Sequence, residues 1–367
     1  MMKAVVVALL VLASAGVAHA YPQYQLSRDA TCTSCHIAPE GGGLLNENGL
    51  AVSESISWKP GDSTFFYGVE TPDWLHVGGD VRAAGGFVYP GFASAAVYPM
   101  QAEVYANAGS HGFSINLFGG LRRPQSGAPL HAFWSRQHYV MWQQHPDEGR
   151  GLYVRVGRLS PTFGLRLAEH VAYTQRFGGA PLYDEAYAVA ASYVVPRFEI
   201  HATGFVHDPI ATEVEHGDGG ALYAEVRVTE HVAVGAEAKY ASSNDQDRTY
   251  AGVTGKLYLP GPEVLLLGEA QYIHQALNTG SMDKTTQLAA YVMASKPLPS
   301  GFMLDLGAGH YTEDTRVAGT DRECVDANLH WFMTSHLEWI LTTRLELIDK
   351  GSGPNGGYAL AQVHYRL

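Results

Sequence analysis

The chain has 367 residues, of which only 16% are charged, and it combines a formal net charge of −12 with 41 glycines and 21 tyrosines. The acidic residues are spread along the chain, which argues against a nucleic-acid partner and leaves no polybasic patch for anionic lipid. Three cysteines are too few for a disulfide framework. Low charge with many glycines and aromatics, and no long apolar run past the N-terminus, favours alternating β-structure over a bundle of membrane helices.

The first twenty residues have the pattern of a secretory signal peptide. Lys3 gives a positive start, residues 4–17 are almost wholly apolar, and Ala18-His19-Ala20 has the small-x-small form of a cleavage site. The apolar run is too short for a spanning helix. Residues 1–20 are therefore expected to be removed on export, and the mature chain is expected to begin at Tyr21.

One CxxCH motif follows, formed by Cys32, Cys35 and His36. Two thiols at this spacing can add across the two vinyl groups of one haem, and the histidine that follows is placed to ligate the iron. A zinc site would need a second Cys/His pair, which the lone Cys324 cannot supply. We therefore expect one covalent haem c, held by Cys32 and Cys35, with His36 as the proximal iron ligand.

The haem-bearing segment, residues 21–73, is shorter than a self-contained small cytochrome c domain. It contains no methionine, and its only histidine is His36. The segment therefore cannot enclose a haem alone. The sixth ligand and the surroundings of the haem are expected to come from the rest of the chain.

From Trp74 onward, runs of about ten residues alternate between apolar and polar side chains, the period of β-strands with two unlike faces. In one such run, Phe113, Ile115 and Leu117 alternate with Ser114 and Asn116. The pattern predicts sixteen strands, near 75–88, 97–108, 112–121, 131–143, 151–158, 186–195, 197–207, 218–229, 231–242, 249–259, 263–275, 284–296, 301–312, 323–333, 336–348 and 357–367.

The connections between these strands alternate between short and long with few exceptions. Short turns on one rim, long loops on the other and an even strand number are typical of an outer-membrane barrel with periplasmic turns. The fold class predicted for residues 74–367 is thus all-β, a transmembrane antiparallel β-barrel in contact with outer-membrane lipid. A soluble pair of β-sandwich domains is the alternative, but its outer faces would carry more charge. The chain ends in Leu367, whereas such barrels usually end in an aromatic residue.

The longest connection, residues 159–185, is the third external loop. In general porins the loop at this position folds into the lumen, and Arg158, Arg166, Glu169, His170 and Arg176 would then line a constriction. An exposed surface loop is the alternative.

The alternation of inward and outward residues along the strands reduces the number of candidates for the sixth iron ligand. His76 and His364 are predicted to face inward at the periplasmic rim on strands that pair when the barrel closes, and Met293 and Met303 to face inward near the same rim. The alternative for each of the four is a lumen residue with no role at the iron. A further alternative is a five-coordinate iron, which has no sixth ligand.

The combination resembles the porin–cytochrome fusions of the outer membrane in iron-oxidising bacteria. That family opens with Ala-x-Pro-x-aromatic seven residues before CxxCH, and Ala20, Pro22 and Tyr24 match it, while residues 25–31 depart from it. Residues 41–46 and 156–166 look more like haem-bearing barrels of other proteobacterial and myxobacterial lineages. The resemblance implies one c-type haem ahead of a sixteen-stranded barrel.

Three functions are compatible with these features. The leading hypothesis is a non-enzymatic electron carrier that works across the outer membrane between an external electron donor or acceptor and a periplasmic electron carrier. The second is a porin or uptake channel in which the haem segment is a plug or sensor. The third is a haem enzyme such as a peroxidase, with Arg82 and His76 as distal groups.

Overall fold

The computed structural model describes residues 23–28, 30–89, 96–122, 132–168, 171–182, 184–207, 217–278, 284–348 and 356–367. The expected signal peptide and its cleavage site lie outside these residues. In the described part of the chain, no helix is both long and apolar enough to cross a membrane.

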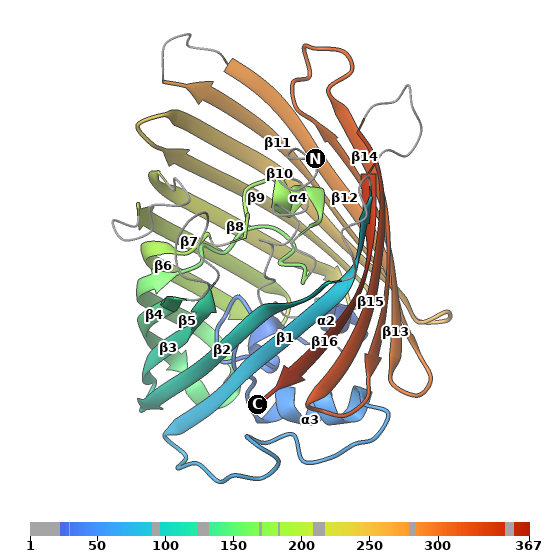
Figure 1. The fold of residues 1–367 in the computed structure, drawn as a ribbon. Helices are drawn as coiled ribbons and strands as arrows, with labels where there is room; N and C mark the ends of the chain where they lie inside the picture. The colour runs from blue at the N-terminus through green and yellow to red at the C-terminus, as the bar shows by residue number, and fades with distance from the viewer. Residues whose placement is uncertain are drawn as a thin grey trace.

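Sixteen antiparallel strands of the described residues form one closed sheet, in which each strand pairs with its sequence neighbours and β16 pairs with β1 (Figure 1). The first eight strands are β1 (Leu75–Tyr89), β2 (Ala96–Ser110), β3 (Phe113–Arg122), β4 (Ala132–His145), β5 (Arg150–Leu159), β6 (Ala186–Val195), β7 (Phe198–Val206) and β8 (Asp218–Thr229). The other eight are β9 (Val232–Ser242), β10 (Gln246–Leu259), β11 (Val264–Leu277), β12 (Lys284–Leu298), β13 (Phe302–Thr312), β14 (Asp321–Phe332), β15 (Leu337–Leu347) and β16 (Gly356–Arg366). All sixteen predicted strands are confirmed, with ends within three residues of the prediction.

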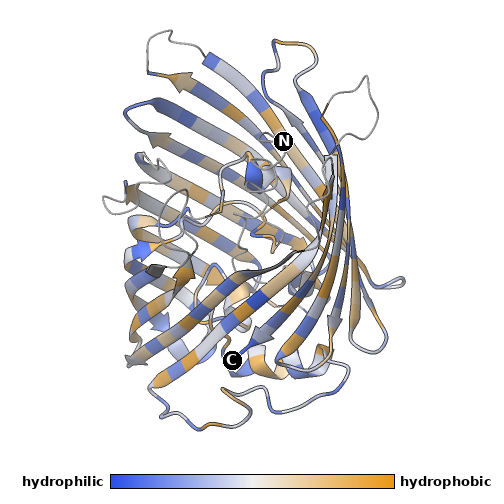
Figure 2. Ribbon diagram, in the orientation of Figure 1, coloured by the Kyte–Doolittle hydropathy of each residue, from blue (hydrophilic) through white to orange (hydrophobic). Residues whose placement is uncertain are grey.

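The two faces of the wall differ as the alternation predicted (Figure 2). In β3, Ile115 and Leu117 are 54% and 51% exposed on the outer face, whereas Asn116 between them is 1% exposed and faces the lumen. The same pattern holds in β15, where Leu341 and Leu345 face outward and Arg344 is buried. An apolar exterior around a polar interior is the arrangement that a bilayer requires of a barrel.

The rim that carries the short turns also carries the C-terminus. The β2–β3 turn is made by His111 and Gly112, both with positive φ (54° and 83°), the backbone that two-residue hairpins need to match the strand twist. By the rule that short turns are periplasmic, this rim is the periplasmic one. The connection between β9 and β10, residues 243–245, is a short exception on the external rim.

The segment before β1 lies within the periplasmic half of the barrel (Figure 1). It contains α2 (Gln23–Ser27), the 3₁₀ turn η1 (Cys32–Ser34) and α3 (Glu47–Ile56). Helix α2 packs on β10 and β11, and α3 lies at the periplasmic rim (Figure 1). The remaining short helices are η2 (Pro146–Glu148), in the β4–β5 turn, and α4 (Tyr173–Arg176), in the third external loop.

The segment is tied to the wall by its backbone. The amides of Trp58 and Lys59 donate to the carbonyls of Phe332 and Met333, over 2.8 and 3.1 Å. Farther along, His336 Nε2 lies 2.7 Å from the carbonyl oxygen of Asp62. Residues 58–62 therefore follow the β14–β15 turn, so the segment is part of the barrel's own packing.

Candidate functional site

The CxxCH residues form a tight turn. The amides of Cys35 and His36 both donate to the carbonyl of Cys32, over 3.2 and 2.9 Å, so the two cysteines lie on one turn of η1. Cys32 is buried, and Gln25 Nε2 lies 3.1 Å from its sulfur. Burial raises the pKa of the Cys32 thiol to about 11, so it is neutral at physiological pH.

A run of three glycines positions the His36 ring. Gly41, Gly42 and Gly43 all have positive φ (84°, 78° and 59°), a path that residues with a Cβ rarely take. The run brings the Gly42 carbonyl oxygen to 3.1 Å from His36 Nδ1. A Cβ on Gly43 would lie 2.4 Å from a ring carbon of Phe118 on β3, so the loop is also pressed against the wall.

This contact decides the tautomer of His36. A carbonyl oxygen only accepts, so Nδ1 must carry the proton, and the lone pair of the neutral ring is on Nε2. Burial lowers the pKa of His36 to about 4, which keeps the ring neutral. Histidines that bind metals commonly donate their other N–H to a backbone carbonyl in this way. The ring is thus neutral, and its Nε2 lone pair is the one that a metal could use.

Helix α3 closes over the CxxCH turn. Asn46 is its N-cap and accepts a hydrogen bond from the Gly49 amide over 3.0 Å, while its side-chain nitrogen donates to the carbonyl of Thr33 over 3.0 Å. Glu47 adds a carboxylate to the first turn, where the helix dipole favours it. Gly49 is needed for the close approach, because a Cβ there would lie 2.1 Å from the Cys35 carbonyl oxygen.

We expect Asn46→Ala to loosen this segment. The substitution removes the cap and the bond to Thr33, a loss of about 1–2 kcal/mol in local stability. Glu-C cleavage after Glu54, within α3, followed by mass spectrometry on the folded barrel, should become about 5- to 30-fold faster, because cleavage samples the locally opened state. Asn46→Asp retains the capping oxygen and should cleave at a rate closer to the parent. Equal rates in Asn46→Ala and the parent would show that the cap does not hold the segment.

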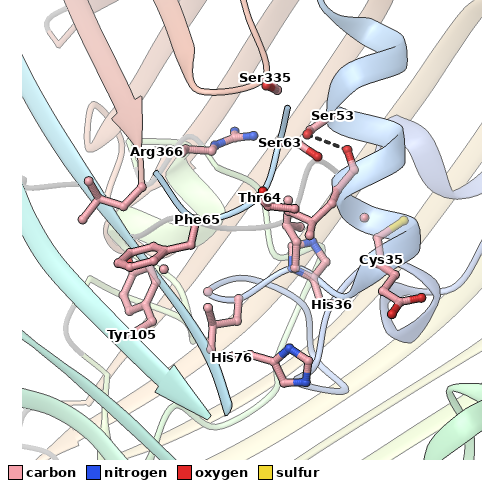
Figure 3. A pocket seen from close by; sticks show the side chains of 18 of the residues that line it. Cys35, His36, Ser53, Ser63, Thr64, Phe65, His76, Tyr105, Ser335 and Arg366 are labelled. Carbon is pink, nitrogen blue, oxygen red and sulfur yellow. Dashed lines mark hydrogen bonds between the residues drawn. The ribbon is translucent and has the colours of Figure 1, made fainter. Parts of the chain in front are cut away.

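A cavity of about 620 Å³ lies between this segment and the wall. Its lining combines Cys32, Cys35 and His36 with Leu44 and Leu50 of the segment. The wall contributes His76, Val77, Asp80 and Arg82 from β1, Tyr105 from β2, and His336, Arg366 and Leu367 from the C-terminal strands and their turn. Figure 3 shows the rings of His36 and His76 at this cavity, with Cys35 and Tyr105 on opposite sides of it. The volume is within the range of about 300–1,000 Å³ that is usual for cofactor sites.

The four predicted distal ligands are separated by the fold. Only His76 lines the cavity. Met303 is buried and accepts a contact of 3.7 Å from the Tyr24 hydroxyl, and Met293 is buried with Leu265 and Leu267 in a separate apolar cluster. His364 faces inward as predicted but does not line the cavity.

His364 is part of a buried chain of imidazoles and carboxylates in the wall. Its Nε2 lies 2.5 Å from Asp80 Oδ1, and its Nδ1 lies 3.0 Å from Glu338 Oε2. The other Glu338 oxygen lies 2.9 Å from Nδ1 of His330, whose Nε2 is 3.3 Å from Asp305. Both nitrogens of His364 are therefore held by carboxylates, which leaves none to approach a metal in the cavity.

The third external loop enters the lumen from the other end, which is one of the two alternatives that the sequence left open. Phe163, Leu165 and Tyr173 are each 1% exposed. Arg166, in the left-handed region with φ 56°, pairs with Glu199 of β7, and its Nη1 also donates to the Glu40 carbonyl over 3.3 Å. The loop and the segment before β1 thus meet inside the barrel.

Of the other four residues predicted to line the constriction, the two that the structure describes bind groups other than those that Arg166 binds. Arg158 is buried and donates to the carbonyls of Ser135 and Arg136. Arg176 is partly exposed and pairs with Glu346 over 3.2 Å. Glu169 and His170 lie outside the described residues.

Comparison with known proteins agrees with this architecture. No protein-family model matches the chain, and no curated protein matches it either. Among solved structures, OmpT of Vibrio cholerae superposes with a TM-score of 0.61 at 12% identity, over 82% of this chain and 100% of that one. OmpF of Salmonella typhi gives 0.60 at 12%, over 80% and 97%, and OprB of Pseudomonas putida gives 0.55 at 10%, over 79% and 93%. The chain is an outer-membrane β-barrel.

Several residues of this site were not singled out from the sequence. Gly42, Asn46 and Gly49 orient the CxxCH turn, and Tyr105 lines the cavity. A signal for α3 was present, since Asn46 followed by Glu47 is a typical helix start. No local signal links Gly42 to His36, because that contact depends on the path of the glycine run.

Proposed function

We propose that this barrel is a monohaem c-type cytochrome of the outer membrane, which passes electrons between an external redox partner and a periplasmic electron carrier. The observation that carries the proposal is the location of the single CxxCH motif, which lines a cavity inside the barrel with the Nε2 lone pair of His36 left for a metal. A haem bound there supplies a one-electron iron couple.

The lining suits a haem in each of its chemical requirements. Cys32 and Cys35 are placed on one turn for two thioether bonds, and His36 presents a neutral imidazole. Leu44 and Leu50 provide apolar surface for a ring. His76 is the proposed sixth ligand, because it lines the cavity, whereas the rings of His364 and His336 have both nitrogens engaged.

The position of the cavity also defines the direction from which partners approach. It lies at the periplasmic rim, so a soluble periplasmic carrier can come close to it. On the other side, the third external loop and the contact between Arg166 and Glu40 separate it from the exterior. The hydrocarbon thickness of about 30 Å is long for one electron step, so the external partner must reach into the barrel or supply a further redox centre.

The test is reduced-minus-oxidised absorbance of the outer-membrane fraction, with haem staining of the denatured chain. The parent should show a c-type band and retain haem through denaturation. Cys32→Ala/Cys35→Ala should lose all covalent haem, while Cys324→Ala, which leaves the motif intact, should retain it. A parent barrel without covalent haem would refute the proposal.

A porin with an internal plug is the second candidate, favoured by the superposition on OmpF and OprB. Planar-bilayer conductance separates the two functions. In a porin, ions would pass with residues 23–73 in place. In the electron-transfer function, the filled lumen keeps the conductance of the parent low.

A further inference from the structure

Arg82, at the cavity, differs from the other buried arginine and lysine side chains of the described residues in its hydrogen-bond partners. Eight arginine and lysine side chains of the described residues are at most 9% exposed. Six of them are paired with carboxylates: Arg136 with Glu103 and Glu185, Arg155 with Glu40, Arg166 with Glu199, Lys239 with Asp184, Lys256 with Glu225, and Arg344 with Asp326. Arg158 donates to two backbone carbonyls. Arg82, 7% exposed, makes no hydrogen bond or close ion pair with any described residue.

The neighbouring carboxylate of Asp80 makes no hydrogen bond or close ion pair with Arg82. Asp80 is two residues away on the same inward face of β1 and is close enough to sense the charge of Arg82. Its two oxygens are directed to other partners, Oδ1 to His364 over 2.5 Å and Oδ2 to the Tyr105 hydroxyl over 2.7 Å. The cross-strand neighbours of Arg82 are His364 and Gln101, and neither is an acid.

A guanidinium buried without an anion is costly, since its hydration is lost without compensation. Arg82 lines the same cavity as His36, and its Nε is fully buried without a hydrogen bond. A planar fork of N–H donors is the group best suited to bind a carboxylate with two parallel bonds. The cavity therefore contains a carboxylate-binding position that the protein's own acids leave open.

We propose that Arg82 binds a propionate carboxylate of the haem, which orients the ring between the CxxCH turn and β1. This inference rests on the proposed function. The propionates are on the edge of a haem opposite the vinyl groups, which the cysteines hold. Cys35 lies on one side of the cavity, and Tyr105, which is bonded to Asp80 beside Arg82, lies on the other (Figure 3). The two ends of the cavity thus match the two ends of the ligand.

The test is spectroelectrochemical titration of the purified full-length barrel in detergent. Arg82→Gln removes a positive charge and leaves a propionate without its partner, so the oxidised haem is favoured. The midpoint potential should fall by about 59 mV, which corresponds to a change of about tenfold in the one-electron redox equilibrium constant. The potential should also acquire a pH dependence between about pH 5 and pH 8, because the unpaired carboxylate now titrates.

Controls separate the possible outcomes. Arg197→Gln, an exposed change in the β6–β7 turn, removes the same charge far from any lumen contact and should leave the potential unchanged. If Arg82→Gln does not fold, Arg82→Lys decides, with a smaller fall expected because the charge remains and the fork is lost. A folded, haem-loaded Arg82 variant with the parent's potential at every pH would overturn this inference alone, whereas a parent without covalent haem would overturn the proposed function itself.

Discussion

Glu338→Ala is expected to destabilise the barrel by about 3–5 kcal/mol, because it removes the shared partner of two buried imidazoles. Glu338 is 3% exposed and binds Nδ1 of His330 over 2.9 Å and Nδ1 of His364 over 3.0 Å. These contacts join β14, β15 and β16, and Asp80 extends the chain across the seam between β16 and β1. The loss therefore weakens the region where the first and last strands close the sheet.

The measurement is equilibrium unfolding in denaturant and detergent, followed by tryptophan fluorescence, with the free energy of unfolding taken from the midpoint and slope. Glu313→Ala is the matched control, since that carboxylate is 60% exposed in an external loop and should change the stability by less than about 0.5 kcal/mol. If both variants unfolded within about 1 kcal/mol of the parent, the chain of imidazoles and carboxylates would not be a stabilising feature of the seam.

Most of the fold could be predicted from the sequence, because the strands of a membrane barrel alternate apolar residues, which face the lipid, with polar residues, which face the lumen. The clearest difference is the start of β10, at Gln246 instead of the predicted residue 249. Gln246, Asp247 and Arg248 are polar on both faces, so no alternation marks them. They are in the strand because they pair with Leu277, Ala276 and Gln275 of β11, respectively, a contact that depends on the register of the neighbouring strand.

The prediction of a haem site at Cys32, Cys35 and His36 needs only their spacing, because the CxxCH motif is local. The surroundings of these residues could not be predicted in the same way. Parity placed His364 inward, which its burial confirms. Parity could not reveal that both of its nitrogens are bound to Asp80 and Glu338, since the three residues come together only when the barrel closes.

The segment before β1 and the barrel wall depend on each other. The segment supplies the thiols and His36, while the wall supplies His76, Arg82 and Tyr105. Neither encloses the cavity alone, because its lining comes from both. The wall of the cavity and the β16–β1 seam also share one polar network. Asp80 accepts a hydrogen bond from Tyr105, which lines the cavity, and contacts His364 across the seam.

His76→Ala is expected to convert the haem from a six-coordinate, low-spin form to a five-coordinate, high-spin form, with the Soret band moving to shorter wavelength. His76 is the one predicted distal ligand that lines the cavity, whereas both ring nitrogens of His364 are bound to carboxylates. Added imidazole should enter the vacated position and restore the low-spin spectrum in the variant, while the parent should not respond.

Met303→Leu is the matched control, because Met303 is buried against Tyr24 and does not itself line the cavity, and the spectrum of this variant should match the parent's. Rescue by imidazole distinguishes a lost ligand from a loosened fold, since a structural defect would not be repaired by a small base. A His76→Ala spectrum identical to the parent's would mean that the cavity holds its iron with His36 alone. The opening beside β1 would then be free for an external ligand, and the peroxidase-like arrangement of His76 and Arg82 would become the hypothesis to test.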